Sequence, residues 1–357
     1  MNILGFNPSH HGSVCLLQDG ELKYFIQEER LTRKKYDSVP FKSFIDILEN
    51  YKIDYITFST PSVECPTSSE EAAPYWYVLA SKYNPNVKLI SYTSDHHMCH
   101  GAHSFLNSGF NRSIGIVIDG MGSFHKEYEY RETESIFEFS YPLDIKILYQ
   151  NITHIPTKVN MSRAYEAITM HLGWSRDEAG KTMGLSSYGK ANTTSPKFIE
   201  KNTSSSVFYY NPSDPTDFDV YVNTPLSTEP KNWHYNPHNI SDIEKDIAYQ
   251  IQSESQQLVG DYVEKAIKKT GINQVCCAGG YFLNCVTNYY LIKRFPNIKF
   301  YFEPIANDAG TSIGASQLVW HHLNQKTKAI LPLKSLYLGK QYSKKELLEG
   351  IKSYLDN

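Results

Sequence analysis

The sequence predicts an α/β protein with two similar lobes, and two observations support this fold class. A group of antiparallel strands followed by alternating helices and strands occurs twice along the chain, first within residues 2–118 and again from residue 135. A chain of 357 residues, 41% of them hydrophobic, is also long enough to form two cores. Because no internal sequence repeat is visible, the similarity of the lobes is inferred from the order of their elements.

The first lobe begins with three short strands joined by tight turns. Asp19 and Gly20 form a dipeptide that is typical of the turn in a β-hairpin. Pro40 is suited to begin a helix over residues 41–51. Alternating or continuous apolar residues indicate strands at 2–6, 13–18, 21–27, 55–60, 87–92 and 114–118.

The second lobe repeats this order with longer elements. Ser241 and Glu244 form a capping-box pattern at the start of a long helix that ends before Gly271. Residues 191–239 are rich in Ser, Thr, Asn and Pro, which is typical of a surface insertion. Further helices are expected around 164–172 and at 311–321, and strands within 135–149 and at 272–277 and 298–302.

The charge of the chain argues against partners that bind through bulk electrostatics. The formal net charge is -3 and the pI is about 6.5, so neither bulk nucleic acid nor a membrane surface is an expected partner. No basic segment precedes a long apolar one at the N-terminus, so we expect a cytoplasmic protein. The six cysteines lack the spacing of a disulfide framework and are expected to be buried free thiols.

Ser9 and His10 lie in the turn between the first two strands. A tight turn exposes backbone N–H groups that can bind phosphate oxygens, and an adjacent imidazole can act as a general acid or base. A solvated or structural histidine is the alternative, because most histidines in turns have no catalytic role.

His96 and His100 lie four positions apart in the segment Asp-His-His-Met-Cys-His. On a helix, this spacing places both imidazoles on one face, where they can bind one ion such as zinc or iron. A histidine-rich helix start in solvent is the alternative, and an anionic ligand would decide between the two. Asp119, at a strand end before glycine, and Asp308, directly before a helix, are the candidates. Each aspartate could instead be a cap or turn residue.

Gly279 and Gly280 follow a buried strand and precede a helix. Glycines at such a point let the backbone approach a ligand, and a helix N-terminus favours anions, so we predict a nucleotide site there. A purely structural turn is the alternative. Lys181 lies in a glycine-containing segment without the spacing of a phosphate-binding P-loop, although its ammonium group could still contact phosphate.

Taken in order, these segments resemble the carbamoyltransferase family that includes nodulation protein U and antibiotic O-carbamoyltransferases. The resemblance covers nearly the whole chain and rests on residues 9–10, 27–37, 95–100, 119–120, 180–185, 279–284 and 307–310. The main domain of that family is similar to the protein that completes threonylcarbamoyladenosine in tRNA. It implies an actin-like (ribonuclease H-like) fold with a nucleotide cleft between the lobes.

The resemblance also implies an activity and its cofactors. A carbamoyl group would move from carbamoyl-adenylate, made from carbamoyl phosphate and ATP, to a hydroxyl of a small-molecule or nucleotide acceptor. The implied cofactor is a divalent metal, with Fe²⁺ favoured and Zn²⁺ or Mn²⁺ as alternatives. The predicted metal ligands are His96, His100, Asp119 and Asp308. The predicted nucleotide-binding residues are Ser9, Gly279, Gly280, Asn284 and Gly310, and the predicted catalytic residues are His10 and Lys181.

The same resemblance suggests domain boundaries and one departure. We expect lobe I at 1–125 and lobe II at 126–333, with a final helix at 309–323 that returns to lobe I. Family members continue into a domain that makes carbamoyl-adenylate, so residues 334–357 are expected to be a linker and the truncated start of that domain. A separate adenylate-forming domain or chain is then an expected partner, and a homodimer remains open. His11 departs from the family, which usually has an acidic residue there.

Three other functions fit part of the pattern. Two histidines and one aspartate could hold iron in an oxygenase, although the glycine-rich strand-to-helix turn argues against that class. A non-catalytic actin-like nucleotide-binding module and a tRNA threonylcarbamoyl transferase-like enzyme are the others. The acceptor cannot be identified from the sequence, although Trp233 and neighbouring tyrosines in the insertion could stack on a sugar or base.

Overall fold

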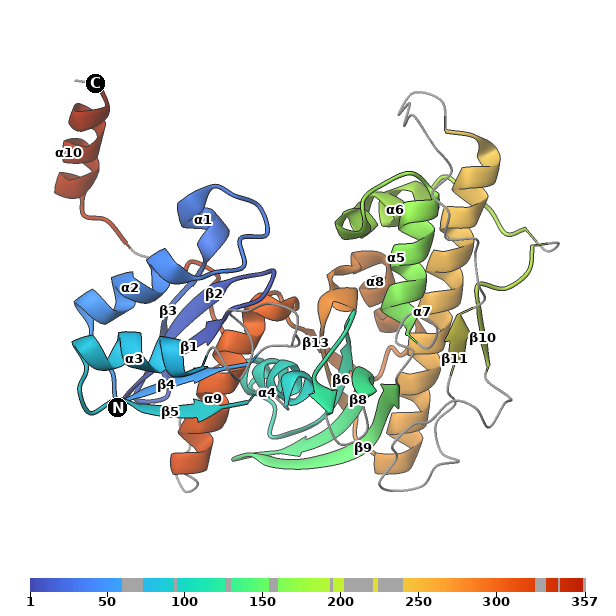
Figure 1. The fold of residues 1–357 in the computed structure, drawn as a ribbon. Coiled ribbons are helices and arrows are strands. Elements are labelled where there is room, and N and C mark those ends of the chain that lie inside the picture. The colour runs from blue at the N-terminus through green and yellow to red at the C-terminus, as the bar shows by residue number, and fades with distance from the viewer. Residues whose placement is uncertain are drawn as a thin grey trace.

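The computed structural model describes residues 1–59, 73–92, 95–125, 130–153, 160–192, 195–201, 221–223, 240–324, 332–339 and 341–355. These residues form two lobes side by side, each built on a mixed sheet with helices packed against it (Figure 1). The predicted α/β fold with two lobes is thereby confirmed. No helix within the described ranges is both long enough and apolar enough to span a bilayer.

The first sheet has the strand order β3-β2-β1-β4-β5. Its strands are β1 (Asn2–Asn7), β2 (Ser13–Gln18), β3 (Glu21–Gln27), β4 (Tyr55–Phe58) and β5 (Lys88–Ser91). β1 pairs antiparallel with β2 and parallel with β4, and β4 pairs parallel with β5. Buried side chains of this sheet form one core with α2 (Phe41–Asn50) and α3 (Ala73–Tyr83).

The second sheet repeats this topology. Its order is β13-β12-β6-β8-β7, with β9 also paired to β8. The strands are β6 (Arg112–Ile118), β7 (Phe124–His125), β8 (Tyr130–Ser140), β9 (Asp144–Thr153), β12 (Gln274–Ala278) and β13 (Lys299–Phe302). β6 pairs antiparallel with β8 and parallel with β12, as β1 does with β2 and β4. The two lobes, whose similarity was inferred from the order of their elements, are therefore alike in the order and direction of their strands.

The two sheets divide earlier in the chain than the expected boundary at residue 125. β6 and β7 belong to the second sheet, because β6 forms its hydrogen bonds with β8 and β12. The second set of antiparallel strands therefore begins at Arg112 rather than at Ser135. α9 (Thr311–Leu323) packs against β1, β2 and β4 of the first sheet, although it follows the last strand of the second.

The remaining helices complete the two lobes. They are α1 (Glu28–Thr32), α4 (His96–Ser108), α5 (Met161–His171), α6 (Ala179–Ser186), α7 (Asp242–Thr270), α8 (Cys285–Arg294) and α10 (Lys344–Leu355). The predicted capping box of α7 is confirmed, because the Ser241 side chain accepts from the Glu244 backbone and the Glu244 side chain accepts in return. Gly271 ends α7 at a φ of 68°.

Two predicted segments are described only in part. Within the predicted insertion at 191–239, β10 (Ile199–Lys201) pairs with β11 (Tyr221–Asn223), and most of the rest, including Trp233, lies outside the described residues. α10 extends away from both lobes near the C-terminus (Figure 1), and none of its residues is buried. Cys15, Cys99, Cys276 and Cys277 are buried free thiols as expected, whereas Cys285 is exposed and Cys65 lies outside the described residues.

Candidate active site

α4 lies between the second sheet and α9, and this position buries its histidines. Its apolar side chains, including Phe105, pack against strand residues such as Phe139 and against Leu318 of α9. A Cβ atom at Gly314 of α9 would lie 2.1 Å from the carbonyl oxygen of Cys99, so the two helices approach closely only because that residue is glycine. The four histidines of α4, which are His96, His97, His100 and His103, have no exposed surface.

Residues of the second lobe, one from the loop after β6 and one from β8, cap the N-terminus of α4. Asp95 occupies the N-cap position but makes no side-chain capping hydrogen bond. Instead, the backbone N–H of His96 donates to Ser123 Oγ at 2.9 Å, and that of His97 donates to Glu132 Oε2 at 3.3 Å. The same Glu132 oxygen accepts from the Ser123 N–H at 3.0 Å. The first turn of α4, which carries His96, is therefore fixed by side chains distant in sequence.

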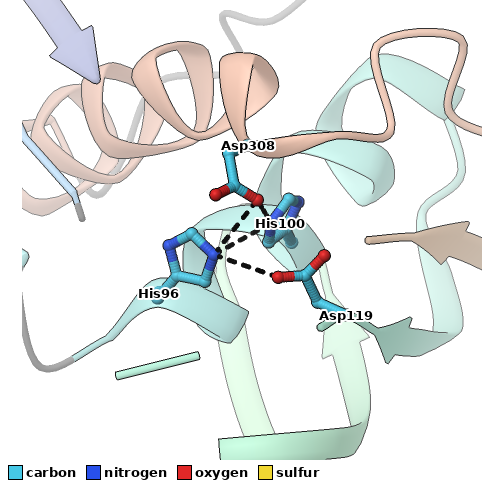
Figure 2. A group of neighbouring side chains, drawn as sticks. All are labelled: His96, His100, Asp119 and Asp308. Carbon is cyan, nitrogen blue, oxygen red and sulfur yellow. Dashed lines mark hydrogen bonds and ion pairs between the residues drawn. The ribbon is translucent and has the colours of Figure 1, made fainter. Parts of the chain in front are cut away.

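His96, His100, Asp119 and Asp308 meet at one point (Figure 2). One donor atom from each residue lies within 4.8 Å of the others. The Nε2 atoms of His96 and His100 are 3.2 Å apart, and they lie 3.6 Å and 3.5 Å from Asp308 Oδ1. Asp119 Oδ2 lies 3.7 Å from His96 Nε2. Both imidazoles thus lie on one face of α4, and the two aspartates face them.

Electrostatics make this cluster a site that requires positive charge. Burial raises the pKa of Asp308, but His10, His96 and His100 outweigh it and hold this pKa well below its ordinary value. Burial lowers the pKa of His96, but the carboxylates of Asp308 and Asp119 outweigh it and raise this pKa to about 10. Burial also raises the pKa of Asp119, but His96 and His100 outweigh it and lower this pKa. Both carboxylates are therefore ionised, and protons on the imidazoles or a cation must balance them.

The donor set fits a first-row divalent metal. Two imidazole nitrogens and carboxylate oxygens are ligands that zinc, iron and manganese accept. His96 Nδ1 lies 3.5 Å from Ser59 Oγ, a contact that would orient the ring and leave Nε2 directed at the cluster. Among the described residues, His100 Nδ1 has no hydrogen-bond partner.

A pocket with a volume of about 410 Å³ lies beside this cluster, where the lobes meet. Lobe I contributes the β1–β2 turn with His10 and also Tyr36. Lobe II contributes the loop after β6, the first turns of α5 and the turn after β12. Asp119 and Asp308 belong to its wall, so the cluster opens onto it. The volume falls in the range of small-molecule sites.

The turn after β12 is joined to the cluster by a hydrogen bond. The backbone N–H of Gly280 donates to Asp119 Oδ1 at 2.9 Å. Gly279 has a φ of 92°, and a Cβ atom there would lie 2.3 Å from the carbonyl oxygen of Ile118. Only glycine lets this turn pass so close to the end of β6. Gly279 therefore shapes the pocket without lining it.

The structure separates the predicted site residues into three groups. His10, Asp119, Gly280, Asn284 and Asp308 line the pocket. His96 and His100 lie behind its wall, fully buried. Ser9, Lys181, Gly279 and Gly310 are not part of the wall.

Lys181 and Gly310 both lie outside the residues that line the pocket, in different surroundings. The ammonium group of Lys181 pairs with Glu178 on the same helical turn. A Cβ atom at Gly310 would lie 2.3 Å from the carbonyl oxygen of Ile305 and 2.6 Å from His103 Nδ1, so this glycine serves close packing. Ser9 is buried, and its hydroxyl has no partner among the described residues.

Four pocket residues on α5 were missed by sequence reasoning. They are Ser162, Arg163, Tyr165 and Glu166. Arg163 Nε donates to the carbonyl oxygen of Gly120 at 3.0 Å, and its guanidinium pairs with Glu166. Asn160, the N-cap of α5, also donates to the carbonyl oxygens of Asp119 and Gly120. The available signal was this N-cap asparagine, whereas the helix was predicted from its apolar positions alone.

Asn284 belongs to a buried hydrogen-bond network. Its Oδ1 accepts from the Thr287 N–H, and its Nδ2 donates to Gln252 Oε1 at 2.8 Å. The Tyr165 hydroxyl donates to the same Gln252 oxygen at 2.8 Å. The network fixes two neighbouring wall residues, Asn284 and Tyr165, from α7 behind them.

A family model described as the carbamoyltransferase N-terminus matches residues 66–317 of the chain. The uncharacterized protein sll1178 of Synechocystis sp. (strain ATCC 27184 / PCC 6803 / Kazusa) is 24% identical over 97% of this chain and 62% of its own length. Nodulation protein NolNO of Sinorhizobium fredii (strain NBRC 101917 / NGR234) is 22% identical over 88% of this chain and 47% of its own length. The chain therefore spans about half the length of these curated relatives.

Two solved structures share the fold. Full-length HypF in its phosphate- and nucleotide-bound form is 14% identical, with a TM-score of 0.52, over 92% of this chain and 56% of that chain. HypF of T. kodakarensis is 14% identical, with a TM-score of 0.54, over 93% of this chain and 49% of that chain. At this level of identity the likeness concerns the two-lobed architecture.

Proposed function

The chain belongs to the carbamoyltransferase family, and we propose that it transfers a carbamoyl group from carbamoyl-adenylate to a hydroxyl of a small-molecule or nucleotide acceptor. One observation carries the proposal beyond family membership. A buried cluster of two imidazoles and two carboxylates opens through Asp119 and Asp308 onto a pocket between the lobes. A charged donor and a hydroxylated acceptor could meet there.

We assign the metal to His96, His100 and Asp308, with Asp119 beside them. Fe²⁺ is the favoured ion, with Zn²⁺ and Mn²⁺ as alternatives, because this ligand set suits all three. When bound, such an ion would supply Lewis-acid stabilisation for the anionic oxygens of the donor. The Gly280 turn and Asn284 would hold the nucleotide part of the donor on the other side of Asp119.

His10 is the proposed acceptor of the proton. Its side chain is 55% exposed, and its Nδ1 lies 3.6 Å from Asp308 Oδ2, which leaves Nε2 for a substrate. The acceptor oxygen forms a bond to the carbamoyl carbon while its proton passes to His10 Nε2. The bond between that carbon and the phosphate oxygen breaks, and AMP leaves with the electron pair. Asp308 then faces a positively charged imidazole, which it stabilises.

The donor would be made outside the described lobes. The relatives are longer than this chain, by enough to contain a further domain. We propose that residues 334–357 form the linker to such a domain and the first part of it. A separate chain that converts ATP and carbamoyl phosphate into carbamoyl-adenylate would serve equally.

The test supplies the chain with synthetic carbamoyl-adenylate and a panel of hydroxylated metabolites and nucleotides. Mass spectrometry is expected to show a carbamoylated acceptor and an equal amount of AMP. With ATP and carbamoyl phosphate instead, this chain alone is expected to form no product. Binding of carbamoyl-adenylate without transfer to any acceptor would favour a non-catalytic nucleotide-binding module and contradict the proposal.

A further inference from the structure

A second group of metal-ligating side chains adjoins the cluster and shares one residue with it. One donor atom from each of His10, His11 and Asp308 lies within 4.8 Å of the others. The rings of His10 and His11 are neighbours, with centroids 4.2 Å apart. Both histidines line the pocket, so this group lies on the substrate side of Asp308.

Asp308 directs its two oxygens toward different histidines. Oδ1 lies 3.6 Å and 3.5 Å from the Nε2 atoms of His96 and His100. Oδ2 lies 3.6 Å from His10 Nδ1 and has no hydrogen-bond partner among the described residues. His11 Nδ1 is likewise buried without a partner there. A buried carboxylate oxygen and a buried imidazole nitrogen without partners are costly, and a shared cation would satisfy both.

The backbone holds the two halves of this group together. The Asn7 side chain is fully buried and donates from Nδ2 to the carbonyl oxygens of His11, at 3.2 Å, and of Asp308, at 3.0 Å. Ser13 Oγ donates to the carbonyl oxygen of Ala309 at 2.8 Å. The β1–β2 turn is thus fastened to the turn that carries Asp308, which preorganises the ligands.

We propose that His10, His11 and Asp308 form a second divalent-cation site, with Asp308 bridging it to the first. The ligand set of two imidazoles and one carboxylate suits an ion such as Zn²⁺ or Co²⁺. A cation there would bind the two atoms, His10 Nδ1 and Asp308 Oδ2, that the transfer reaction uses. A neutral imidazole bound through Nδ1 carries its proton on Nε2 and cannot accept another. Filling the second site therefore inhibits transfer, and this consequence rests on the proposed function, whereas the site itself does not.

The test is the stoichiometry of Co²⁺ binding in equilibrium dialysis. All variants carry Cys285→Ser, which removes as a competing ligand the one thiol that is exposed among the described residues. The parent is expected to bind two equivalents. His11→Phe keeps the aromatic contact with Tyr36 but has no ring nitrogen. This variant is expected to bind one equivalent of Co²⁺, at the His96 and His100 cluster, with the same affinity as in the parent. His322→Ala, at an exposed position of α9, is the matched control and is expected to bind two.

Thermal unfolding checks that each variant is folded, and His11→Gln repeats the test if the phenylalanine is not tolerated. One equivalent in the parent, or two in both His11 variants, overturns the site. In the transfer assay, adding a second equivalent of Co²⁺ is expected to lower the transfer rate of the parent but not the transfer rate of His11→Phe. A parent rate that does not fall overturns the inhibitory role. If no transfer is seen at all, the proposed function fails while the stoichiometry still decides the site.

Discussion

Asp119 and Gly280 connect the buried histidine–aspartate cluster with the glycine turn, because the Gly280 N–H donates to Asp119 Oδ1 at 2.9 Å while Asp119 Oδ2 faces His96. One carboxylate thus contacts both parts of the proposed site. A change in the charge of Asp119 should therefore alter metal affinity at the proposed site, and a change in its position should alter the conformation of the glycine turn.

Asp119→Asn separates these two roles. The amide keeps an oxygen for the Gly280 N–H but removes the negative charge beside His96. We expect metal affinity to fall by about 10–100-fold, while binding of AMP without metal stays unchanged. Isothermal titration calorimetry with Zn²⁺ and with AMP measures both. Unchanged metal affinity would show that Asp119 takes no part in metal binding.

His10→Ala is expected to suppress transfer without affecting nucleotide binding. Loss of a positioned general base typically lowers a rate by about 10²–10⁴-fold. The measurement compares single-turnover rates with carbamoyl-adenylate and, separately, the Kd for AMP. Transfer at the rate of the parent protein would exclude His10 as the proton acceptor.

Gly279→Ala should destabilise the protein, because this residue has a φ of 92° and its backbone lies against Ile118. The conformation alone costs about 1–3 kcal/mol for a residue with a Cβ atom, and the contact with Ile118 adds to that cost. The matched control is Gly184→Ala, where a Cβ atom meets nothing within 4 Å and the helix gains about 1 kcal/mol. Urea unfolding measures both; equal effects would contradict the close approach.

Glu303→Gln should change how stability depends on pH. Burial raises the pKa of Glu303 from its ordinary 4.5 to about 7, although Ile305 N–H, Asn107 and Tyr301 hydrogen bonds oppose this. Between these two values the folded protein keeps a proton that the unfolded chain has released. The stability contributed by protonated Glu303 is therefore full below pH 4.5 and is lost as the pH rises through about 7.

Glu303→Gln has no carboxyl group to titrate at this position, so it does not lose this stability as the pH rises. Relative to the parent, its free energy of unfolding should improve by about 3 kcal/mol between about pH 4.5 and pH 8. Burial also lowers the pKa of the neighbouring His103, to about 3, so this imidazole is neutral over the whole range. Urea unfolding across this range provides the measurement, and a constant difference between the two proteins would contradict the raised pKa of Glu303.

Local patterns predicted those features of the fold that depend on neighbouring residues. The capping box at Ser241 and the four-residue spacing of His96 and His100 both gave correct local structure. The division of the sheets was misplaced, because the membership of β6 is decided by hydrogen bonds to β8 and β12 rather than by its own sequence.

The same limit applies to the site. The pairing of Asp308 with His96 could be inferred only through family resemblance, since more than 200 positions separate them. Glu132 of β8 accepts from the first turn of α4, and Asn7 donates to the carbonyl oxygen of Asp308. The sequence around these two residues gives no sign that they fix the site. Their role arises from tertiary contacts that no single segment encodes.

The most direct measurement is an anomalous-scattering difference map, collected at the iron and zinc absorption edges from crystals grown with the metal. A peak about 2.0–2.2 Å from His96 Nε2, His100 Nε2 and an Asp308 oxygen is the expected result. A map without a peak there, from protein that carries bound metal elsewhere, would contradict the assignment of the cluster as a metal centre.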